Sequence, residues 1–321
     1  LLTGGTGSFG RKFVKLTLEK YNPIKIIIYS RDEIKQWEMA HDYSDDERIR
    51  FFVGDVRDSV RLHRAFHEVD YVVHAAALKI VPSAEYNPFE CIKTNIEGAV
   101  NVINCAIDQK VKRVVALSTD KACNPVNLYG ATKLCSDKLF IAGNAYSGKQ
   151  DTRFAVVRYG NVLASRGSVI PFFIKTAQKG EIPITDERMT RFIITLEDAV
   201  NMVWFALEDC KGGEIYIRKS PSIKIMDLAK AVSPAAKLKV IGMRPGEKLH
   251  ELLVSMYDAE YTYEYDKYFK ILPQIYGWSD DVERIGEGVA CVKNFIYSSD
   301  RNNQWMSRDE LSSWIKEEYK M

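Results

Sequence analysis

The residues best placed to do chemistry are Asp120 and Lys121, followed at helical spacing by Tyr129 and Lys133. A Tyr and a Lys four residues apart lie on one face of a helix, so the ammonium can sit beside the phenol. That proximity lowers the pKa of the Tyr and makes its phenolate a usable base for a hydroxyl group. Asp120 and Lys121 add an acid and a second base, and Thr119 completes the candidate catalytic set. The sequence therefore predicts several proton transfers around one hydride transfer.

Spaced glycines open the sequence in the segment TGGTGSFG. They let backbone amides approach a pyrophosphate at the N-terminus of the helix that follows. A tight turn is the alternative, but the helical pattern up to Leu18 and the strand pattern at 25–29 favour a dinucleotide site. Because the strand before the glycines is cut short, we expect residues upstream of Leu1 to be missing. The candidate cofactor-binding residues of this segment are Thr3, Gly4, Thr6, Gly7, Ser8, Phe9 and Gly10.

The choice of nicotinamide cofactor is made after the second strand. A ribose 2'-hydroxyl calls for a carboxylate there, whereas a 2'-phosphate calls for an arginine. Ser30 and Arg31 occupy this position, and Lys35 is close behind. Asp32 is the counter-argument because its carboxylate could turn inward, and an exposed Arg31 without a ligand is the other alternative. We predict NADP.

Composition excludes several classes of function. A chain of 321 residues suits one large α/β domain or two closely packed ones, and 46% hydrophobic residues suffice for a sizeable core. Lys and Arg total 45 against 43 Asp and Glu, so no global field recruits nucleic acid or an acidic membrane. No apolar run approaches the ~18 to 20 residues of a membrane span, and no signal peptide is visible. The cysteines form no CxxC pair and the histidines no metal-ligand spacing, which indicates a cytoplasmic, reducing compartment and no metal site.

Short apolar strands alternate with amphipathic helices in the first half, which predicts a parallel sheet covered on both faces. Ligands bind such sheets at the carboxyl ends of the strands. Asp55 could accept a hydrogen bond from the adenine amino group, whereas Asn95 could equally be a packing residue of a long helix over 88–109. Strands are expected at 25–29, 50–53, 70–74, 113–117 and 154–157. Further candidate cofactor residues are Asp55, Val56, Ala75, Ala76, Ala77 and Asn95.

The second half has a looser pattern. Helices are expected at 168–179, 196–210 and 225–232, and strands at 182–185 and 214–217. We predict a cofactor-binding domain over 1–162, to which elements of about 192–230 return. Residues 163–321 then form mainly a substrate-binding lobe.

With these residues in place, the chain resembles the extended short-chain dehydrogenase/reductase superfamily, whose landmarks match TGGTGSFG, GDVRD and YGATK. Within it, the chain is similar to the inverting UDP-N-acetylglucosamine 4,6-dehydratases of pseudaminic acid biosynthesis. The motifs are STDKACNPVNLYGATK, RYGNVLASRGSVIPFF, PITDERMTRF and MRPGEKLHE, and the resemblance runs from residue 1 to about residue 275. It implies a Rossmann-type doubly wound parallel sheet with a smaller, interleaved substrate-binding lobe. It also implies a homo-oligomer, either a dimer or a multiple of dimers, and a role in flagellin glycosylation.

The resemblance implies conversion of UDP-N-acetylglucosamine to a UDP-2-acetamido-2,6-dideoxy-4-hexulose with inversion at C5. Bound NADP+ would take hydride from C4 while Tyr129 takes the O4 proton and Lys133 holds the phenol and the nicotinamide ribose. Asp120 would protonate the departing O6 hydroxyl, and Lys121 would remove the C5 proton. Lys121 must be neutral for this, so we expect its pKa to fall well below about 10.4, helped by Lys133, the oxidised nicotinamide and burial. A local ion pair with Asp120 is the alternative.

The substrate diphosphate needs cationic partners and helix-end amides. The candidate substrate-binding residues are Lys79, Asn161, Arg191, Arg244 and Glu247, each of which could instead be exposed to solvent. A retaining sugar-nucleotide dehydratase, a C4 epimerase and a noncatalytic NADP-sensing regulator are the rival functions. Asp120 argues against an epimerase, which has no use for an acid at O6. Retention of Tyr129 argues against a regulator.

Overall fold

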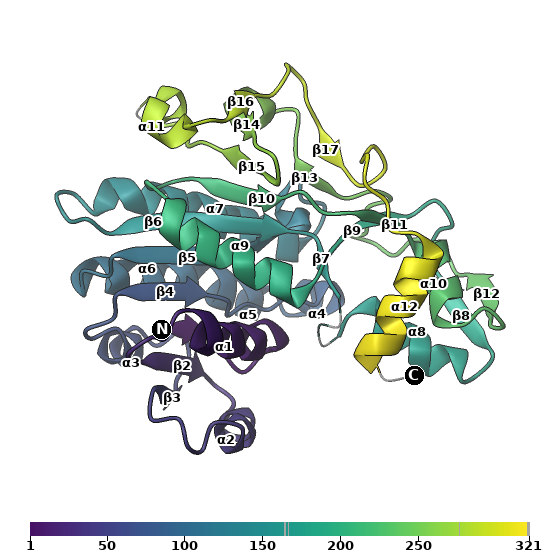
Figure 1. Ribbon diagram of the computed structural model, residues 1–321, viewed down its shortest axis with the longest axis horizontal. Coiled ribbons are helices and arrows are strands. Elements are labelled where there is room, and N and C mark those ends of the chain that lie inside the picture. Colours follow the sequence, from purple (N-terminus) through teal and green to yellow (C-terminus); the bar gives the residue numbers. More distant parts are fainter. Residues whose placement is uncertain (164, 166, 276, 320–321) are drawn as a thin grey trace.

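The structure is a computed structural model, and it describes residues 1–163, 165, 167–275 and 277–319. Within these residues a ten-stranded sheet forms the centre of the molecule (Figure 1). The first seven strands in the order given next pair in parallel with their neighbours. The last three strands pair antiparallel. From one edge to the other the strands are β3 (Ile49–Val53), β2 (Ile26–Ser30), β1 (Leu2–Thr3), β4 (Tyr71–His74), β5 (Arg113–Thr119), β6 (Arg153–Tyr159), β10 (Ile215–Arg218), β15 (Tyr268–Ile271), β14 (Thr262–Glu264) and β16 (Val289–Ala290).

Helices cover both faces of the sheet, as Figure 1 shows for α1 and α9 on one side and α6 and α7 on the other. The central strands β5 and β6 are buried on both faces, which explains their nearly continuous apolar runs of Val, Ala, Leu and Phe. One apolar core lies under α1 (Ser8–Lys20) and α9 (Leu196–Asp209). The other lies under α3 (Ser59–Ala65), α6 (Gly98–Asp108) and α7 (Leu128–Tyr146), and α2 (Glu33–His41) follows β2. The predicted doubly wound parallel sheet is therefore confirmed.

The long helix expected over 88–109 is present but interrupted. It consists of α5 (Pro88–Ile92), a π-helical turn η1 (Lys93–Glu97) and α6, and α4 (Val81–Tyr86) precedes it. The π turn contains Asn95, whose buried side-chain amide both accepts and donates hydrogen bonds. Its side chain accepts from the backbone N–H of Leu78 at 2.8 Å and donates to the Leu78 carbonyl at 3.0 Å and to Thr132 Oγ1 at 3.0 Å. Asn95 thus ties the segment after β4 to α7.

Replacing Asn95 by Leu should destabilise the fold by about 2 kcal/mol, because both backbone groups of Leu78 lose a partner away from water. Urea unfolding of Asn95→Leu measures this loss. The matched control is Asn104→Leu, on an exposed position of α6. Equal stability of the two variants would show that the Leu78 groups find other partners.

A smaller lobe lies beside the large sheet in Figure 1. It has its own apolar core. The helix expected at 168–179, the strand at 182–185 and the helix at 225–232 all occur there, each within two residues of its predicted start. The helix predicted at 196–210 is α9, which packs on the large sheet, and the strand predicted at 214–217 is β10, which belongs to that sheet. The lobe comprises α8 (Val169–Ala177), β8 (Glu181–Ile184), β12 (Lys237–Val240), α10 (Ile225–Val232), α12 (Arg308–Tyr319) and the sheet of β7 (Asn161–Val162), β9 (Thr190–Ile194) and β11 (Ser222–Lys224).

The two parts of the molecule are not separated at one point of the chain. Strands β14, β15 and β16, which lie late in the sequence, belong to the large sheet. The division into a cofactor-binding part over 1–162 and a substrate-binding part over 163–321 therefore stays a proposal. Over the residues described, no helix combines the length and apolar character needed to cross a membrane. The remaining short elements are η2 (Asp120–Ala122), β13 (Leu252–Val254), η3 (Ala259–Tyr261), η4 (Trp278–Asp280), α11 (Val282–Ile285) and β17 (Tyr297–Ser298).

Candidate active site

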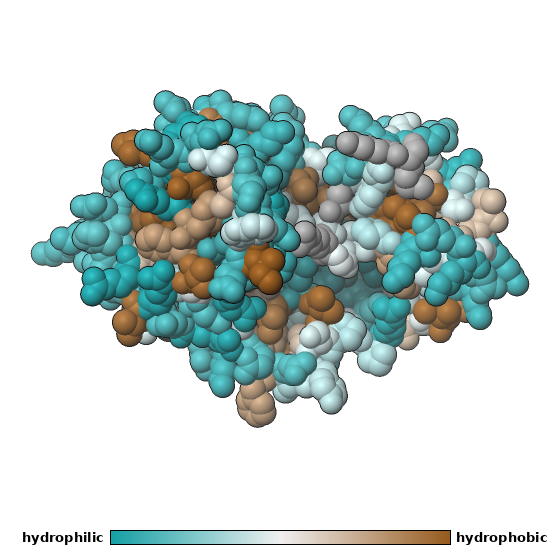
Figure 2. All heavy atoms as spheres, turned by 90° about the horizontal axis from the view of Figure 1, so that it is seen from below, coloured by the Kyte–Doolittle hydropathy of each residue, from teal (hydrophilic) through white to brown (hydrophobic). Residues whose placement is uncertain are grey.

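A cleft of about 800 Å³ opens where the parallel strands end, and segments that follow β1, β2, β4, β5 and β6 line it. Figure 2 shows the surface hollowed between the larger part of the molecule and the smaller lobe. Binding at the carboxyl ends of the strands is the rule for sheets of this type. All the predicted catalytic residues line the cleft, together with most of the predicted cofactor residues.

The glycine-rich turn at the start of the chain is packed too tightly for side chains. Gly4 has a positive φ of 67°, and a Cβ there would lie 2.9 Å from the backbone nitrogen of Ala76. A Cβ on Gly10 would lie 2.2 Å from the Gly5 carbonyl oxygen. Helix α1 begins at Ser8, and no side chain caps its N-terminus among the residues described. The turn therefore brings bare backbone and a helix N-terminus to the cleft, which fits a dinucleotide pyrophosphate.

Arg31 lines the cleft at the end of β2, and the carboxylate of the next residue, Asp32, is bonded to Lys35. Asp32 Oδ1 accepts from the backbone N–H of Lys35 at 3.0 Å, and its other oxygen pairs with the Lys35 ammonium. The carboxylate of Asp32 is therefore occupied in capping α2. The side chain of Arg31 is 52% exposed and lies 3.6 Å from Asp55 Oδ2. Arg31 is more exposed than Asp32 and Lys35, which pair with each other.

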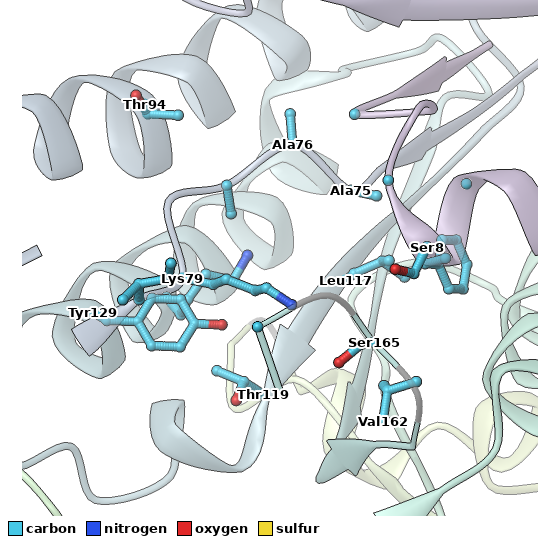
Figure 3. Close-up of a pocket in the computed structure, with 18 of the residues that line it drawn as sticks. Ser8, Ala75, Ala76, Lys79, Thr94, Leu117, Thr119, Tyr129, Val162 and Ser165 are labelled. Carbon is cyan, nitrogen blue, oxygen red and sulfur yellow. The ribbon is translucent and has the colours of Figure 1, made fainter. Parts of the chain in front are cut away.

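The candidate catalytic residues meet where β5 ends and α7 begins. Thr119 Oγ1 donates to Asp120 Oδ1 at 2.9 Å, and Lys121 Nζ donates to the same oxygen at 3.1 Å. Helix α7 approaches this turn closely, since a Cβ on Gly130 would lie 2.2 Å from the Lys121 carbonyl oxygen. Figure 3 shows Tyr129, Thr119 and Lys79 on one side of the pocket and Ser8 on the other. The acid–base groups thus share one cleft with the dinucleotide turn.

The pKa values of Tyr129 and Lys121 correct two expectations. Burial raises the pKa of Tyr129 to about 12, and the Lys121 charge and a hydrogen bond with Thr119 offset only part of this rise. Burial lowers the pKa of Lys121, but the Asp120 and Glu251 carboxylates outweigh it, so the net pKa lies above its usual value. In the protein alone Tyr129 is therefore a neutral phenol and Lys121 a paired cation. The expectation of lowered pKa values was wrong because burial raises the pKa of Tyr129, while the Asp120 and Glu251 carboxylates together raise the pKa of Lys121.

Lys133 is buried one helical turn after Tyr129, as predicted. Burial lowers the pKa of Lys133, and Asp137, one turn further along, offsets part of this effect. Asp137 accepts from Ser118 Oγ at 2.7 Å and lies 3.4 Å from Arg158. This buried cluster fixes the far side of α7 against β5 and β6.

Five of the predicted site residues, all of which the structure describes, do not line the cleft: Thr3, Asp55, Asn95, Arg191 and Glu247. Direct contact of these residues with a ligand stays a prediction. Ala164 and Arg166, which belong to the motif RYGNVLASRGSVIPFF, lie outside the described residues.

Local hydrogen bonds explain where the side chains of Thr3 and Asp55 lie. The Thr3 hydroxyl pairs with His74 Nδ1 at 2.8 Å and accepts from the backbone N–H groups of Ala75 and Ala76 at 3.2 and 3.3 Å. Burial lowers the pKa of His74 to about 3, so this imidazole is neutral. Asp55 accepts from Arg57 Nε and Nη2 at 3.0 and 2.7 Å. Thr3 and Asp55 therefore hold neighbouring segments on the cofactor side of the cleft without lining the cleft themselves.

Arg191 and Glu247 hold the segment at 243–251. The Arg191 guanidinium donates to the backbone carbonyls of Lys248 and Leu249 at 3.0 and 3.1 Å. Glu247 Oε2 accepts from the backbone N–H of Arg244 at 3.2 Å. Arg244 itself lines the cleft, as do Lys79 and Asn161.

Several residues of the site were missed by the sequence reasoning. Tyr159 and Thr94 line the cleft. Their positions close to the predicted site residues Asn161 and Asn95 in the sequence could have indicated them. Glu251 and Lys248 belong to the motif MRPGEKLHE, but nothing in the sequence paired them with the turn after β5. Thr94 Oγ1 and Asn161 Oδ1 are buried without a hydrogen-bond partner among the described residues. Across that same part of the chain, no group of three or more His, Cys, Asp or Glu could hold a metal ion.

Comparisons with known sequences point to nucleotide-sugar enzymes. Residues 1–273 match the family model described as polysaccharide biosynthesis protein. The chain is 56% identical over 318 residues to the UDP-N-acetylglucosamine 4,6-dehydratase (inverting) of Campylobacter jejuni, which covers 97% of this chain and 95% of that protein. It is 46% identical over 279 residues to a UDP-glucose 4-epimerase of Rickettsia canadensis, covering 84% and 82%. The predicted resemblance to the inverting dehydratases is confirmed.

Solved structures share the fold. Pen from Bacillus thuringiensis superposes with a TM-score of 0.91 at 35% identity, covering 100% of this chain and 97% of that one. DesIV, a dTDP-glucose 4,6-dehydratase from Streptomyces venezuelae solved with NAD bound, has a TM-score of 0.69 at 25% identity, covering 77% and 85%. The predicted Rossmann-type fold is therefore confirmed.

Proposed function

We propose that this chain, which belongs to the polysaccharide biosynthesis protein family, dehydrates UDP-N-acetylglucosamine to a UDP-2-acetamido-2,6-dideoxy-4-hexulose and inverts C5. One observation carries this proposal: the hydrogen-bonded Asp120–Lys121 pair lies in the cleft that also holds Tyr129 and the dinucleotide turn. Oxidation of an alcohol alone needs only the Tyr and the Lys of α7. An additional acid and base are what loss of water requires. The product formed from UDP-N-acetylglucosamine tests this function.

In the first step Tyr129, after losing its own proton to solvent, accepts the O4 proton as a phenolate, and Lys133 supports the phenolate and the nicotinamide ribose. The nicotinamide, when bound, supplies the hydride acceptor for C4 and later the hydride donor for C6. Its positive charge also opposes the rise that burial gives to the pKa of Tyr129. Lys121 then removes the proton at C5, which the 4-ketone has acidified, and Asp120 protonates the O6 hydroxyl so that it leaves as water.

The Asp120–Lys121 hydrogen bond explains how both partners reach their working states. At rest the pair is an ammonium and a carboxylate, with Nζ and Oδ1 3.1 Å apart. Transfer of one proton from Nζ to Oδ1 gives a neutral amine and a carboxylic acid, which are the base and the acid that elimination needs. Removal of the C5 proton and protonation of O6 restore the ion pair. Lys121 can therefore act as a base although its net pKa is raised.

The cofactor is a nicotinamide dinucleotide, and we propose NADP. Arg31 is the accessible cation at the end of β2, and Asp32 is committed to α2. A 2'-phosphate would pair with Arg31, whereas a 2'-hydroxyl would find no free carboxylate of Asp32.

Arg31→Met should weaken NADP binding by about 10- to 100-fold, the loss expected for one charged hydrogen-bonded contact. NAD binding should change little because NAD carries no 2'-phosphate. Fluorescence titration of both cofactors against the variant and the wild type measures the ratio. The control is Arg64→Met, an exposed arginine of α3. An equal loss for NAD and NADP would assign Arg31 a structural role.

For the substrate, we propose Lys79 and Arg244 as partners of the diphosphate and the sugar, with Asn161 at the lobe entrance. Lys79 lines the cleft, no hydrogen bond or ion pair occupies it within the described residues, and burial lowers its pKa. The unpartnered Asn161 Oδ1 suits a donor from the ligand. Arg191 and Glu247 would then act by holding the segment that carries Arg244.

A C4 epimerase is the second candidate, favoured by the similarity to the Rickettsia protein. It would use Tyr129 and Lys133 but would leave the Asp120–Lys121 pair without a task. We also propose a cytoplasmic enzyme that supplies pseudaminic acid synthesis for flagellin glycans. A dimer or a multiple of dimers is proposed through the helices around 88–109 and 129–142, where Phe89 and Val100 are exposed.

A further inference from the structure

Glu251 is a buried carboxylate that reaches the turn after β5 from the segment at 243–251. Its residue is 2% exposed, and Oε1 lies 3.3 Å from Lys121 Nζ. The backbone of Glu251 is fixed on both sides by Ser299, which accepts from its N–H at 3.0 Å and donates to its carbonyl at 2.9 Å. Glu251 therefore holds a fixed position against Lys121.

Three cations face Glu251, and two of them are engaged elsewhere. Arg191 Nε lies 3.9 Å from Oε1, and Lys248 Nζ lies 3.7 Å from Oε2. Arg191 donates to backbone carbonyls, and Lys248 donates to the Cys123 carbonyl at 2.5 Å. Lys121 is the member of this group that lines the cleft, with 25% of its side chain exposed. The carboxylate thus acts on the substrate through Lys121.

We propose that Glu251 is a positioning residue that, with Asp120, aims the Lys121 amine into the cleft. This proposal rests on the proposed function of Lys121 as the base at C5. Asp120 Oδ1 accepts a hydrogen bond from Nζ at 3.1 Å, and Glu251 Oε1 pairs with Nζ at 3.3 Å, so two carboxylates flank the amine. After the proton has moved from Nζ to Asp120 Oδ1, rotation about the Cε–Nζ bond turns the lone pair of the neutral amine from Asp120 toward the cleft. During the step the C5–H bond breaks, an N–H bond forms, and the C–H electron pair moves toward the C4 carbonyl.

The charge of Glu251 has a second consequence. Among the residues that the structure describes, Asp120, Glu251 and Arg191 exert the largest charge effects on Lys121, and Tyr129 also lies within reach of its charge. The Glu251 carboxylate stabilises the ammonium that forms when Lys121 takes the C5 proton, and it opposes loss of that proton. Removing this charge therefore lets Lys121 become neutral at a lower pH.

Two substitutions separate orientation from charge. Glu251→Gln keeps an oxygen that can accept from Nζ and removes the charge, so the pH of half-maximal C5 exchange should fall by about one unit. Glu251→Leu removes the acceptor as well, so the maximal exchange rate should fall by about 100-fold. Exchange of the C5 hydrogen with deuterated water, followed by NMR across pH, measures both. The matched control is Glu260→Gln, on an exposed carboxylate.

A second readout does not need turnover. The side-chain ¹³Cε signal of Lys121, assigned by its absence in Lys121→Ala, should titrate at a lower pH in Glu251→Gln than in the wild type. Equal losses of activity in Glu251→Gln and Glu251→Leu with no shift of either profile would overturn the proposal and leave Glu251 a structural role. If the wild type forms no dehydrated product while the titration still shifts, the proposed function fails and the charge coupling stands.

Discussion

Tyr129→Phe should lower turnover of UDP-N-acetylglucosamine by about 100- to 10,000-fold, the usual contribution of one acid–base group. The phenol is the group proposed to accept the O4 proton, and every later step needs the 4-ketone that this oxidation creates. The dinucleotide turn lies on the other side of the cleft, so the variant should still bind NADP. Product formation is followed by NMR, and retained cofactor by absorbance after gel filtration.

The control for this substitution is Tyr146→Phe, at the exposed last turn of the same helix α7. It removes the same hydroxyl group at a position remote from the cleft and should leave turnover within about twofold of the wild type, because surface changes of this kind are nearly neutral. Wild-type turnover by Tyr129→Phe would remove the phenol from the mechanism. Loss of bound NADP in that variant would instead indicate a collapsed site.

Lys121→Ala should stall the reaction after oxidation. Hydride transfer from C4 depends on Tyr129, whereas removal of the C5 proton depends on the amine of Lys121. Exchange of the C5 hydrogen should therefore fall by about 100- to 10,000-fold. The reduced cofactor should still form and be detectable by the absorbance band of the reduced nicotinamide. Single-turnover absorbance and deuterium exchange at C5, measured on the same sample, separate the two steps.

The substitution also removes the partner of two carboxylates, Asp120 and Glu251. Lys121→Arg serves as the charge-matched control, because it preserves the cation but cannot become a neutral base. Both variants should lose C5 exchange, and the Arg variant should retain more thermal stability. Undiminished exchange in either variant would mean that another residue removes the C5 proton.

The sequence was a good guide wherever the signal is local. Glycine spacing predicted the turn before α1, and the spacing of Tyr129 and Lys133 predicted their common helix face, because both depend on a few neighbouring residues. The buried parallel strands were found for the same reason, as continuous apolar runs bounded by turns. Short strands such as β14 and β16 carry too few residues to show a pattern.

The errors concern contacts between distant segments. The raised pKa of Lys121 depends on the neighbouring Asp120 and also on Glu251, which only the folded chain brings within 3.3 Å of Nζ. The contact of Arg191 with the diphosphate stays a prediction, and the sequence did not reveal that backbone carbonyls of the segment at 243–251 accept hydrogen bonds from its guanidinium. In each case residue type and motif were informative about the site, whereas the partner was set by the packing of the two lobes.

The most direct test of the proposed function is proton NMR of the purified protein with UDP-N-acetylglucosamine in deuterated water, first without and then with added NADP. We expect a 6-deoxy-4-keto product that carries deuterium at C5 and shows the couplings of the L-arabino configuration. A D-xylo product would contradict inversion, and formation of UDP-N-acetylgalactosamine would contradict dehydration and establish the C4 epimerase.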